Sequence, residues 1–201
     1  MSAGGWIQKF LKLSCNEYLA EVPLSFIAEP LLRVWLIEDT HRPFPKEGFK
    51  LLCYDTNQSD KRIAIIEETA QIFYYLSHAR YITTKEGMKD MKRKYDLELF
   101  GTCPRVYCEN QPLLPVGLHD APAKSYVKCF CPKCRDIYRP PSVSSTLDGA
   151  AFGTSFPHLF LQNCLEICPR KPQNSYIPRI GGFKIHKDAP ELKLYHEDES
   201  R

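Results

Sequence analysis

Cysteine is the residue that most constrains this 201-residue chain, because four of its nine cysteines fall in two close pairs. Cys103 and Cys108 have four residues between them, Cys131 and Cys134 have two, and 22 residues separate the pairs. An odd total cannot be fully paired within one chain, and clustered cysteines in a reducing compartment are more often metal ligands than disulfide partners. The spacing therefore predicts two short knuckles joined by an insert of hairpin size.

The two pairs match the ligand set of a zinc ribbon. Zinc accepts a closed tetrahedral shell of thiolates and imposes no geometry of its own, so Cys103, Cys108, Cys131 and Cys134 predict one structural Zn²⁺ per chain. A proline follows the first cysteine of each pair, where its fixed φ favours a tight turn. The alternative is four unrelated buried cysteines, which two close pairs at this spacing disfavour.

The other five cysteines are interpreted as packed thiols. One residue separates Cys129 from the second pair, which is too short for a knuckle, so we expect it to pack on a neighbouring strand. Cys164 and Cys168 lie one helical turn apart and could bind a metal, but no second pair accompanies them. Cys15 and Cys53 are isolated. We expect these two, like Cys164 and Cys168, to be buried structural thiols.

Residues 1–98 are predicted to form a helical domain. Its strongest helix runs from about Asp60 to Arg80, after a loop marked by Pro43 and Pro45. Small and apolar side chains recur there at steps of three and four: Ile63, Ile66, Ala70, Phe73 and Ser77. That stripe is expected to face a core.

Two capping boxes are predicted in this domain. Thr83 and Glu86 have the required spacing and open a second helix, and Ser14 and Glu17 have the same spacing near the N-terminus. The buried side of the second helix is expected to carry Met88, Met91 and Tyr95.

Residues 99–162 are predicted to form a small β module. Its β-prone runs are too short for helices and lie at 105–107, 127–130 and 136–138. A linker at 140–145 and a brief helix from Thr154 to Leu161 follow, and residues 163–201 form a basic, proline-punctuated arm whose end frays. We therefore predict an α+β fold: a mostly α-helical N-terminal domain, a small antiparallel β zinc ribbon and an extended C-terminal arm.

Composition excludes several classes of protein. Hydrophobic residues at 43% and charged residues at 25% are average for a globular chain, and a formal charge of +3 disfavours a dedicated nucleic-acid coat. The sequence has no apolar run of about 18 residues, and Lys9 and Lys12 interrupt the place where a signal peptide needs its apolar segment. We expect a cytoplasmic or nuclear protein with no membrane partner.

Two uses of the ribbon are compared: binding nucleic acid and presenting an interface. Between residues 103 and 140 six basic side chains face three acidic ones, and four thiolates on Zn²⁺ carry −2, so the module nets about +1. That is a weak electrostatic footprint for DNA. Val106, Tyr107, Ile137 and Tyr138 are too many apolar side chains for so small a module to bury, which favours an interface; the alternative is that they pack on the helical domain.

No catalytic motif is found in the sequence. Phosphate-loop, HExxH, GxSxG and kinase signatures do not occur, and a four-cysteine shell leaves zinc no open position. The six histidines are scattered, and His78, within the helical stripe, is interpreted as a packing residue. We do not expect an enzyme.

Four strings together closely resemble one family. They are CPRVYCENQP at 103–112, CPKC at 131–134, DGAAFGTSFPH at 148–158 and GFKIH at 182–186. Weaker likeness extends back through NQSD at 57–60 and HARY at 78–81 to WI at 6–7. In this order the strings resemble the regulatory (beta) subunit of casein kinase II over nearly the whole chain.

The resemblance implies a non-catalytic subunit that dimerises through its zinc ribbon and docks catalytic kinase subunits with its arm, in an assembly of two regulatory and two catalytic chains. It also implies that the subunit stabilises and modulates the kinase and recruits protein substrates. By position, the ribbons would pack through Pro104, Val106, Ile137 and Tyr138. The arm would meet the kinase through Arg179, Ile180, Phe183, Lys184 and His186. A nucleic-acid-binding, transcription-type zinc ribbon is kept as the alternative.

The chain departs from the family pattern at three places. Gly181 stands where the family commonly has a tyrosine, which predicts a smaller contact and a floppier arm. The family's acidic, polyamine-responsive loop would fall at about 44–56, where basic and acidic residues balance. Ser2 lacks the acidic neighbours of the family's autophosphorylation site.

Overall fold

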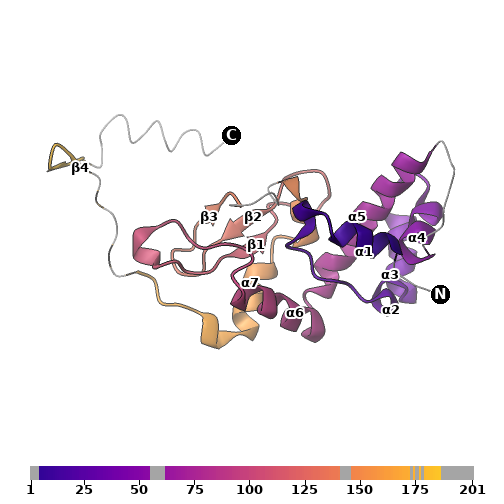
Figure 1. Ribbon diagram of the computed structural model, residues 1–201, viewed down its shortest axis with the longest axis horizontal. Coiled ribbons are helices and arrows are strands. Elements are labelled where there is room, and N and C mark those ends of the chain that lie inside the picture. The colour runs from indigo at the N-terminus through magenta and orange to yellow at the C-terminus, as the bar shows by residue number, and fades with distance from the viewer. Residues whose placement is uncertain are drawn as a thin grey trace.

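The computed structural model describes residues 5–54, 62–140, 146–172, 174, 177 and 179–186. Its α-helices are α1 Gly5–Leu11, α2 Leu24–Ile27, α3 Pro30–Val34, α4 Pro45–Tyr54, α5 Ile63–Tyr81, α6 Lys85–Asp96 and α7 Phe156–Asn163. Its strands are β1 Leu114–Val116, β2 Lys128–Phe130, β3 Ile137–Tyr138, β4 Arg179–Ile180 and β5 Phe183–Lys184. Helices α1–α6 precede the small antiparallel sheets (Figure 1), so the predicted α+β fold is confirmed.

Short 3₁₀ turns and a wider π-helical segment, Trp35–Asp39, connect these elements. They are η1 Ser14–Asn16, η2 Trp35–Asp39, η3 Val106–Cys108, η5 Gly149–Ala151 and η6 Leu165–Ile167. Within the described residues, no helix is both long and apolar enough to cross a bilayer.

Helix α5 is covered on more sides than its periodicity predicted. Four residues of the predicted stripe are buried: Ile66, Ala70, Phe73 and Ser77. Seven further residues of α5 are buried as well: Thr69, Ile72, Tyr74, Tyr75, Leu76, His78 and Tyr81. Helix α4 packs along α5, and η5 from the β module packs against it too. The predicted start of this helix at Asp60 lies outside the described residues.

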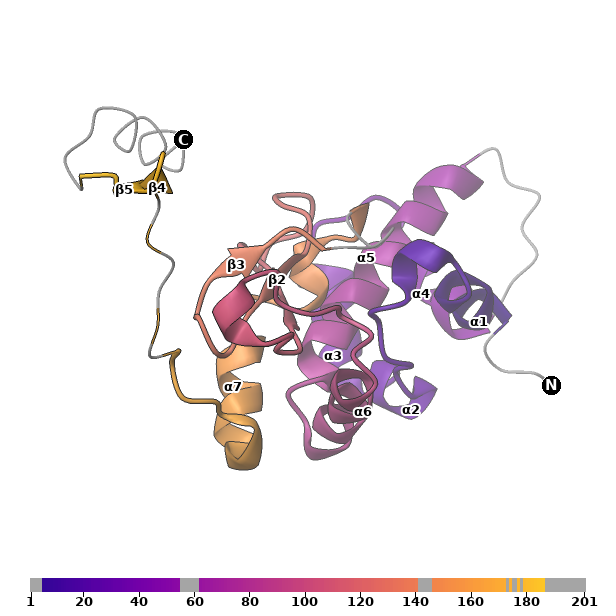
Figure 2. The same cartoon turned by 60° about the vertical axis from the view of Figure 1, so that its left-hand side comes forward.

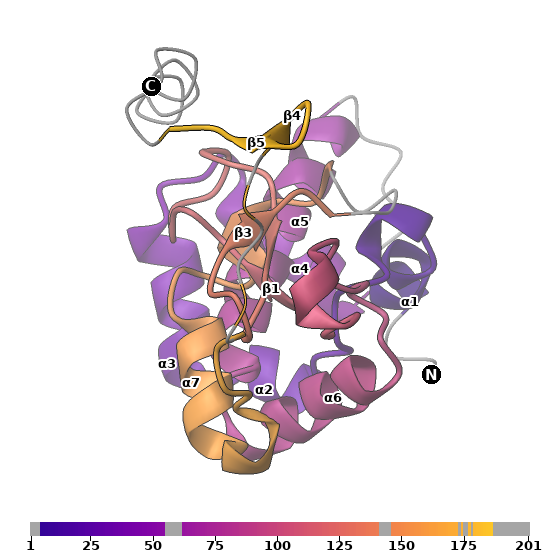
Figure 3. The ribbon, with the colours of Figure 1, turned by 90° about the vertical axis from the view of Figure 1, so that its left-hand side faces the viewer.

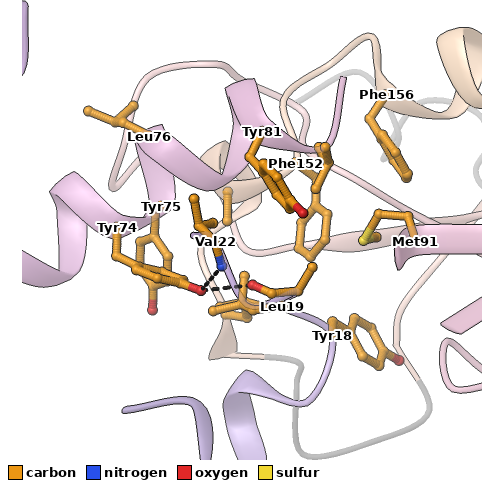
Figure 4. Packing of buried hydrophobic residues seen from close by; sticks show 14 of the residues in the cluster. Tyr18, Leu19, Val22, Tyr74, Tyr75, Leu76, Tyr81, Met91, Phe152 and Phe156 are labelled. Carbon is orange, nitrogen blue, oxygen red and sulfur yellow. Dashed lines mark hydrogen bonds between the residues drawn. The ribbon is translucent and has the colours of Figure 1, made fainter. Parts of the chain in front are cut away.

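A buried N-terminal segment ties α5 to the rest of the core (Figure 4). The Tyr74 hydroxyl donates to Ala20 O at 2.7 Å and accepts from Val22 N at 3.1 Å. Tyr18 packs edge-on against Phe100, with 5.2 Å between the ring centroids. One buried cluster therefore continues from the helices into the β module. The domain boundaries at 98/99 and 162/163 stay predictions.

The predicted capping boxes need correction. Helix α6 is capped by Thr84, whose Oγ1 accepts a hydrogen bond from Gly87 N at 3.2 Å, one position later than predicted. Its buried residues are the predicted Met88, Met91 and Tyr95, together with Gly87. Ser14 caps no α-helix, because the chain there forms η1 without a side-chain cap. Asn16 is buried instead, and its Nδ2 donates to Phe10 O at the end of α1.

Pro45 begins α4 rather than prolonging a loop. Proline is tolerated in the first turn of a helix, where its missing N–H would have no intrahelical partner. The residues for which the family's acidic loop was considered thus include a helix with five buried residues: Gly48, Phe49, Leu51, Leu52 and Cys53.

The β module is a three-stranded antiparallel sheet with the order β1-β2-β3. The runs at 127–130 and 136–138 provide β2 and β3, as predicted. The run at 105–107 was predicted as a strand and is wrong, because most of it lies in η3, where the chain turns so that Cys108 N can bond Arg105 O at 2.9 Å. Helix α7 packs on β1 and begins two residues after the predicted Thr154.

The arm ends its described part in a hairpin. Strands β4 and β5 pair with Arg179 opposite Lys184 and Ile180 opposite Phe183. Figures 1 and 2 show the hairpin apart from the helices. Figure 3 shows the molecule from the side on which the hairpin lies. Of the linker predicted at 140–145, residues 141–145 lie outside the described residues, and so does the end predicted to fray, 195–201.

Candidate metal centre

The first knuckle is closed by backbone hydrogen bonds on both sides of its cysteines. Cys103 N donates to Gln111 O at 2.9 Å, and Gln111 N donates to Cys108 O at 3.1 Å. Glu109 and Asn110 both have a φ of 55°, a left-handed conformation that reverses the chain directly after Cys108. The turn brings the thiols of Cys103 and Cys108 to the same side.

The second knuckle connects β2 to β3. Cys131 N donates to Asp136 O at 2.9 Å, and Arg135 N donates to Cys131 O at 2.8 Å. Arg135 has a φ of 61° and turns the chain back toward β2. Cys134 is therefore held by the same hairpin that pairs the two strands.

The four predicted cysteines lie together. Their sulfur atoms are all within 4.8 Å of one another, with 3.9 Å between Cys103 and Cys134 and 4.0 Å between Cys108 and Cys131. A tetrahedron with metal–sulfur bonds of about 2.3 Å has sulfur atoms about 3.8 Å apart. Three of the cysteines are buried and Cys134 is half-buried. The donor set thus fits one tetrahedral, sulfur-bound ion.

Burial favours the protonated form of two of the four thiols, Cys108 and Cys131. Burial, followed by the neighbouring sulfurs, raises the pKa of Cys108 to about 11, and burial is also the largest cause that raises the pKa of Cys131. The pKa of Cys134 is lowered instead. Burial alone would raise it, but hydrogen bonds outweigh burial, and the bond with the Tyr138 hydroxyl contributes most to the lowering. A divalent ion would stabilise the thiolate form of all four ligands.

Charged side chains connect the two knuckles, which the sequence did not predict. Lys133 lies 3.4 Å from Cys108 O and 2.6 Å from a carboxylate oxygen of Glu109, and Arg105 pairs with Asp136 at 2.5 Å. The feature of the sequence that could have indicated these contacts is Lys133, which lies between the two cysteines of CPKC. Glu109 and Asp136 are two of the three acidic side chains already counted in the net charge of the module, so these pairs join the knuckles without changing that charge.

Three of the remaining cysteines are buried as predicted, one is partly buried and one is exposed. Cys129 is fully buried in β2, where its Sγ lies 3.7 Å from Phe100 O. Cys53 and Cys164 are buried and Cys15 is half-buried. Cys168 was expected to be buried but is exposed, because it follows η6, where the chain leaves the body of the protein.

The ribbon patch comprises Pro104, Val106, Ile137 and Tyr138. Val106 is 84% exposed and Ile137 is 49% exposed, so these two side chains do not pack on the helical part of the chain. Tyr138 is half-buried and packs against the core. A hollow of about 710 Å³ lies beside the patch and is bordered by Pro104, Val106 and the start of the arm at Lys171 and Pro172.

The predicted docking residues of the arm share one hairpin and its flank. Directly opposed residues of an antiparallel pair point to the same face, so Ile180 and Phe183 form an apolar face and Arg179 and Lys184 a basic one. Ile180 is 71% and Phe183 81% exposed, and His186 is also exposed. The role of these five residues in docking stays a prediction.

Four clustered sulfurs beside exposed apolar side chains define the class: a ribbon protein whose four cysteines could together hold one metal ion. The family model for the casein kinase II regulatory subunit matches residues 5–184. The chain belongs to the casein kinase II regulatory subunit family. It is a regulatory subunit and not the catalytic enzyme, as the sequence predicted.

Individual relatives agree with the family match. The chain is 48% identical to casein kinase II subunit beta′ of Saccharomyces cerevisiae, over 92% of this chain and 73% of that protein. It is 41% identical to casein kinase II subunit beta of Dictyostelium discoideum, over 94% of this chain and 71% of that protein. It is also 39% identical to the Suppressor-of-stellate-like protein of Drosophila melanogaster, over 92% of this chain and 81% of that protein.

Proposed function

We propose that this chain is a zinc-dependent homodimer that binds two catalytic kinase subunits, stabilises and modulates them, and helps to recruit protein substrates. The observation that carries the proposal is the tetrad of sulfurs at tetrahedral spacing directly beside the exposed ribbon patch. Cys103, Cys108, Cys131 and Cys134 would hold the ion. When bound, Zn²⁺ would supply no chemistry beyond fixing the two knuckles.

Dimerisation would use the ribbon patch on both copies. An isologous interface joins the same surface of two chains, so one exposed apolar patch suffices for both sides. Val106 lies in the first knuckle and Ile137 in β3, directly after the second, so their relative position depends on the tetrad that joins the two knuckles. Zinc would therefore support dimerisation by fixing the shape of the patch.

Kinase docking would use the apolar face of the β4–β5 hairpin. Ile180 and Phe183 can enter a pocket together, while Arg179 and Lys184 remain at its polar rim. Gly181 and Gly182 have φ values of 54° and 86°, the positive values that a two-residue hairpin turn requires at both positions. The glycine predicted to loosen the arm thus also permits a tight turn.

Regulation in this proposal acts through binding free energy, because a ligand shifts an equilibrium only by its differential affinity for two states. The cysteine content favours the reducing cytoplasm or nucleus for the assembly.

The test combines metal analysis with native mass on the isolated protein. We expect one zinc per chain and a dimer, and comigration with a casein kinase II catalytic subunit in gel filtration at micromolar concentration. A metal-free monomer that does not comigrate contradicts the proposal. Steeply salt-dependent binding to duplex DNA, well above non-specific affinity, would instead favour the transcription-type ribbon.

A further inference from the structure

Tyr138 lies against the metal centre as well as in the ribbon patch. Its hydroxyl oxygen is 3.2 Å from Cys134 Sγ, within hydrogen-bonding distance of a sulfur. The family resemblance assigned this residue to the dimer patch alone. Its neighbour Ile137 is 49% exposed, whereas Tyr138 is half-buried and packed against the core. Successive residues of a strand point to opposite faces, which separates the two side chains.

Strand pairing fixes the position of the Tyr138 ring. Tyr138 stands directly opposite Cys129 in the β2–β3 register, so both side chains lie on the same face of the sheet. Cys129 is fully buried there. The strand β3 starts three residues after Cys134, and the hairpin bond from Cys131 N to Asp136 O holds this spacing. The register therefore sets the face on which the Tyr138 ring lies, and on that face its hydroxyl lies beside Cys134 Sγ.

Cys134 is the ligand that gains most from such a partner. It is the half-buried member of a tetrad whose other three members are buried. The backbone N–H of Cys134 lies 3.5 Å from Cys131 Sγ, and the sulfur of Cys134 has the backbone of Asp136 and the Tyr138 hydroxyl as its own partners. Four thiolates on one divalent ion carry a net charge of −2, and hydrogen bonds to the sulfurs offset that charge.

We propose that Tyr138 is a positioning residue of the metal centre, whose hydroxyl donates a hydrogen bond to the Cys134 thiolate and thereby retains the ion. The inference rests on the zinc site of the proposed function. It adds a donor outside the four ligands and links β3 of the ribbon patch to the most accessible sulfur. Removing such an outer partner typically lowers metal affinity by about 10- to 100-fold.

The test compares Tyr138→Phe with wild type and with Tyr107→Phe in the full chain. Phenylalanine keeps the ring and removes only the hydroxyl. Tyr107 is the matched control, since it lies in the same ribbon and its hydroxyl makes no hydrogen bond within the described part of the chain. Competition with a zinc chelator should show a zinc affinity at least about tenfold weaker for Tyr138→Phe and unchanged for Tyr107→Phe.

A second measurement reports the sulfur directly. In protein loaded with Co²⁺, the thiolate-to-metal charge-transfer band should move to lower energy in Tyr138→Phe, because the thiolate loses a hydrogen bond and donates more strongly. An unchanged zinc affinity overturns the inference. So does weaker zinc binding with an unmoved band, since the hydroxyl would then act only on the fold. Zinc content of the wild type separately tests the site itself.

Discussion

Histidine 78 makes a specific pH dependence of stability measurable. His78 is fully buried in α5 and has a partner on each ring nitrogen. Its Nε2 accepts a hydrogen bond from Ala20 N at 2.9 Å, and its Nδ1–H donates to Ala151 O at 2.6 Å. One neutral imidazole thus joins the N-terminal segment, the long helix and η5, which confirms its interpretation as a packing residue.

Protonation would break this arrangement. The positive form has no acceptor for Ala20 N, and its charge would be buried beside Tyr74 and Phe152. Burial lowers the pKa of His78 from 6.5 to about 4; the hydrogen bond to Ala151 opposes the shift, and the charge of Lys94 adds to it. The unfolded chain therefore binds a proton near pH 6.5, where the folded chain does not.

The sign and size of the effect follow from this difference. Where the unfolded state binds more protons, stability rises with pH, so the His78 contribution is complete above about pH 6.5 and is lost as the pH falls toward 4. Each unit of difference in pKa corresponds to about 1.4 kcal/mol. The two pKa values give a loss of about 2 kcal/mol between neutral pH and pH 5.

The assay is urea unfolding of wild type and His78→Gln at several pH values from 5 to 7.5. Glutamine retains one amide donor and one carbonyl acceptor but does not titrate. Release of metal by acid affects both proteins and cancels in their difference. The difference in unfolding free energy should shrink by about 2 kcal/mol on going to pH 5. A difference that stays constant within about 0.5 kcal/mol would refute the reasoning.

Three other substitutions test the remaining structure. Cys131→Ala should release the metal and unfold the ribbon, because the free energy of metal binding stabilises the fold of such a site. Alanine at the exposed Cys168 should be tolerated and serves as the control. Metal content and circular dichroism measure both effects. Phe183→Ala should weaken docking to a catalytic kinase subunit by about 2 kcal/mol, roughly 30-fold, with unchanged dimer mass, and calorimetry showing equal affinity would remove it as an anchor. Gly87→Ala should destabilise the protein by about 2 kcal/mol, because a Cβ there would lie 2.1 Å from Tyr81 O; a melting temperature equal to that of the exposed Lys85→Ala control would contradict this close approach.

Local signals in the sequence were sufficient for the metal centre and for the longest helix. The tetrad depends on short spacings within each knuckle, and the 3.6-residue period of α5 follows from its own side chains. The short elements were harder to predict. Residues 105–107 have β-prone side chains, but the turn that returns Cys108 to the tetrad overrides that preference.

The sequence by itself determined the four clustered cysteines, the helical first half, the antiparallel ribbon and the family, because these depend on residue types at fixed short spacings. Only the tertiary structure decided that Tyr138 turns toward Cys134 while Ile137 faces outward. It also decided that His78 joins segments 58 and 73 residues away. Such contacts arise between segments distant in sequence, where packing and not local pattern selects the partner.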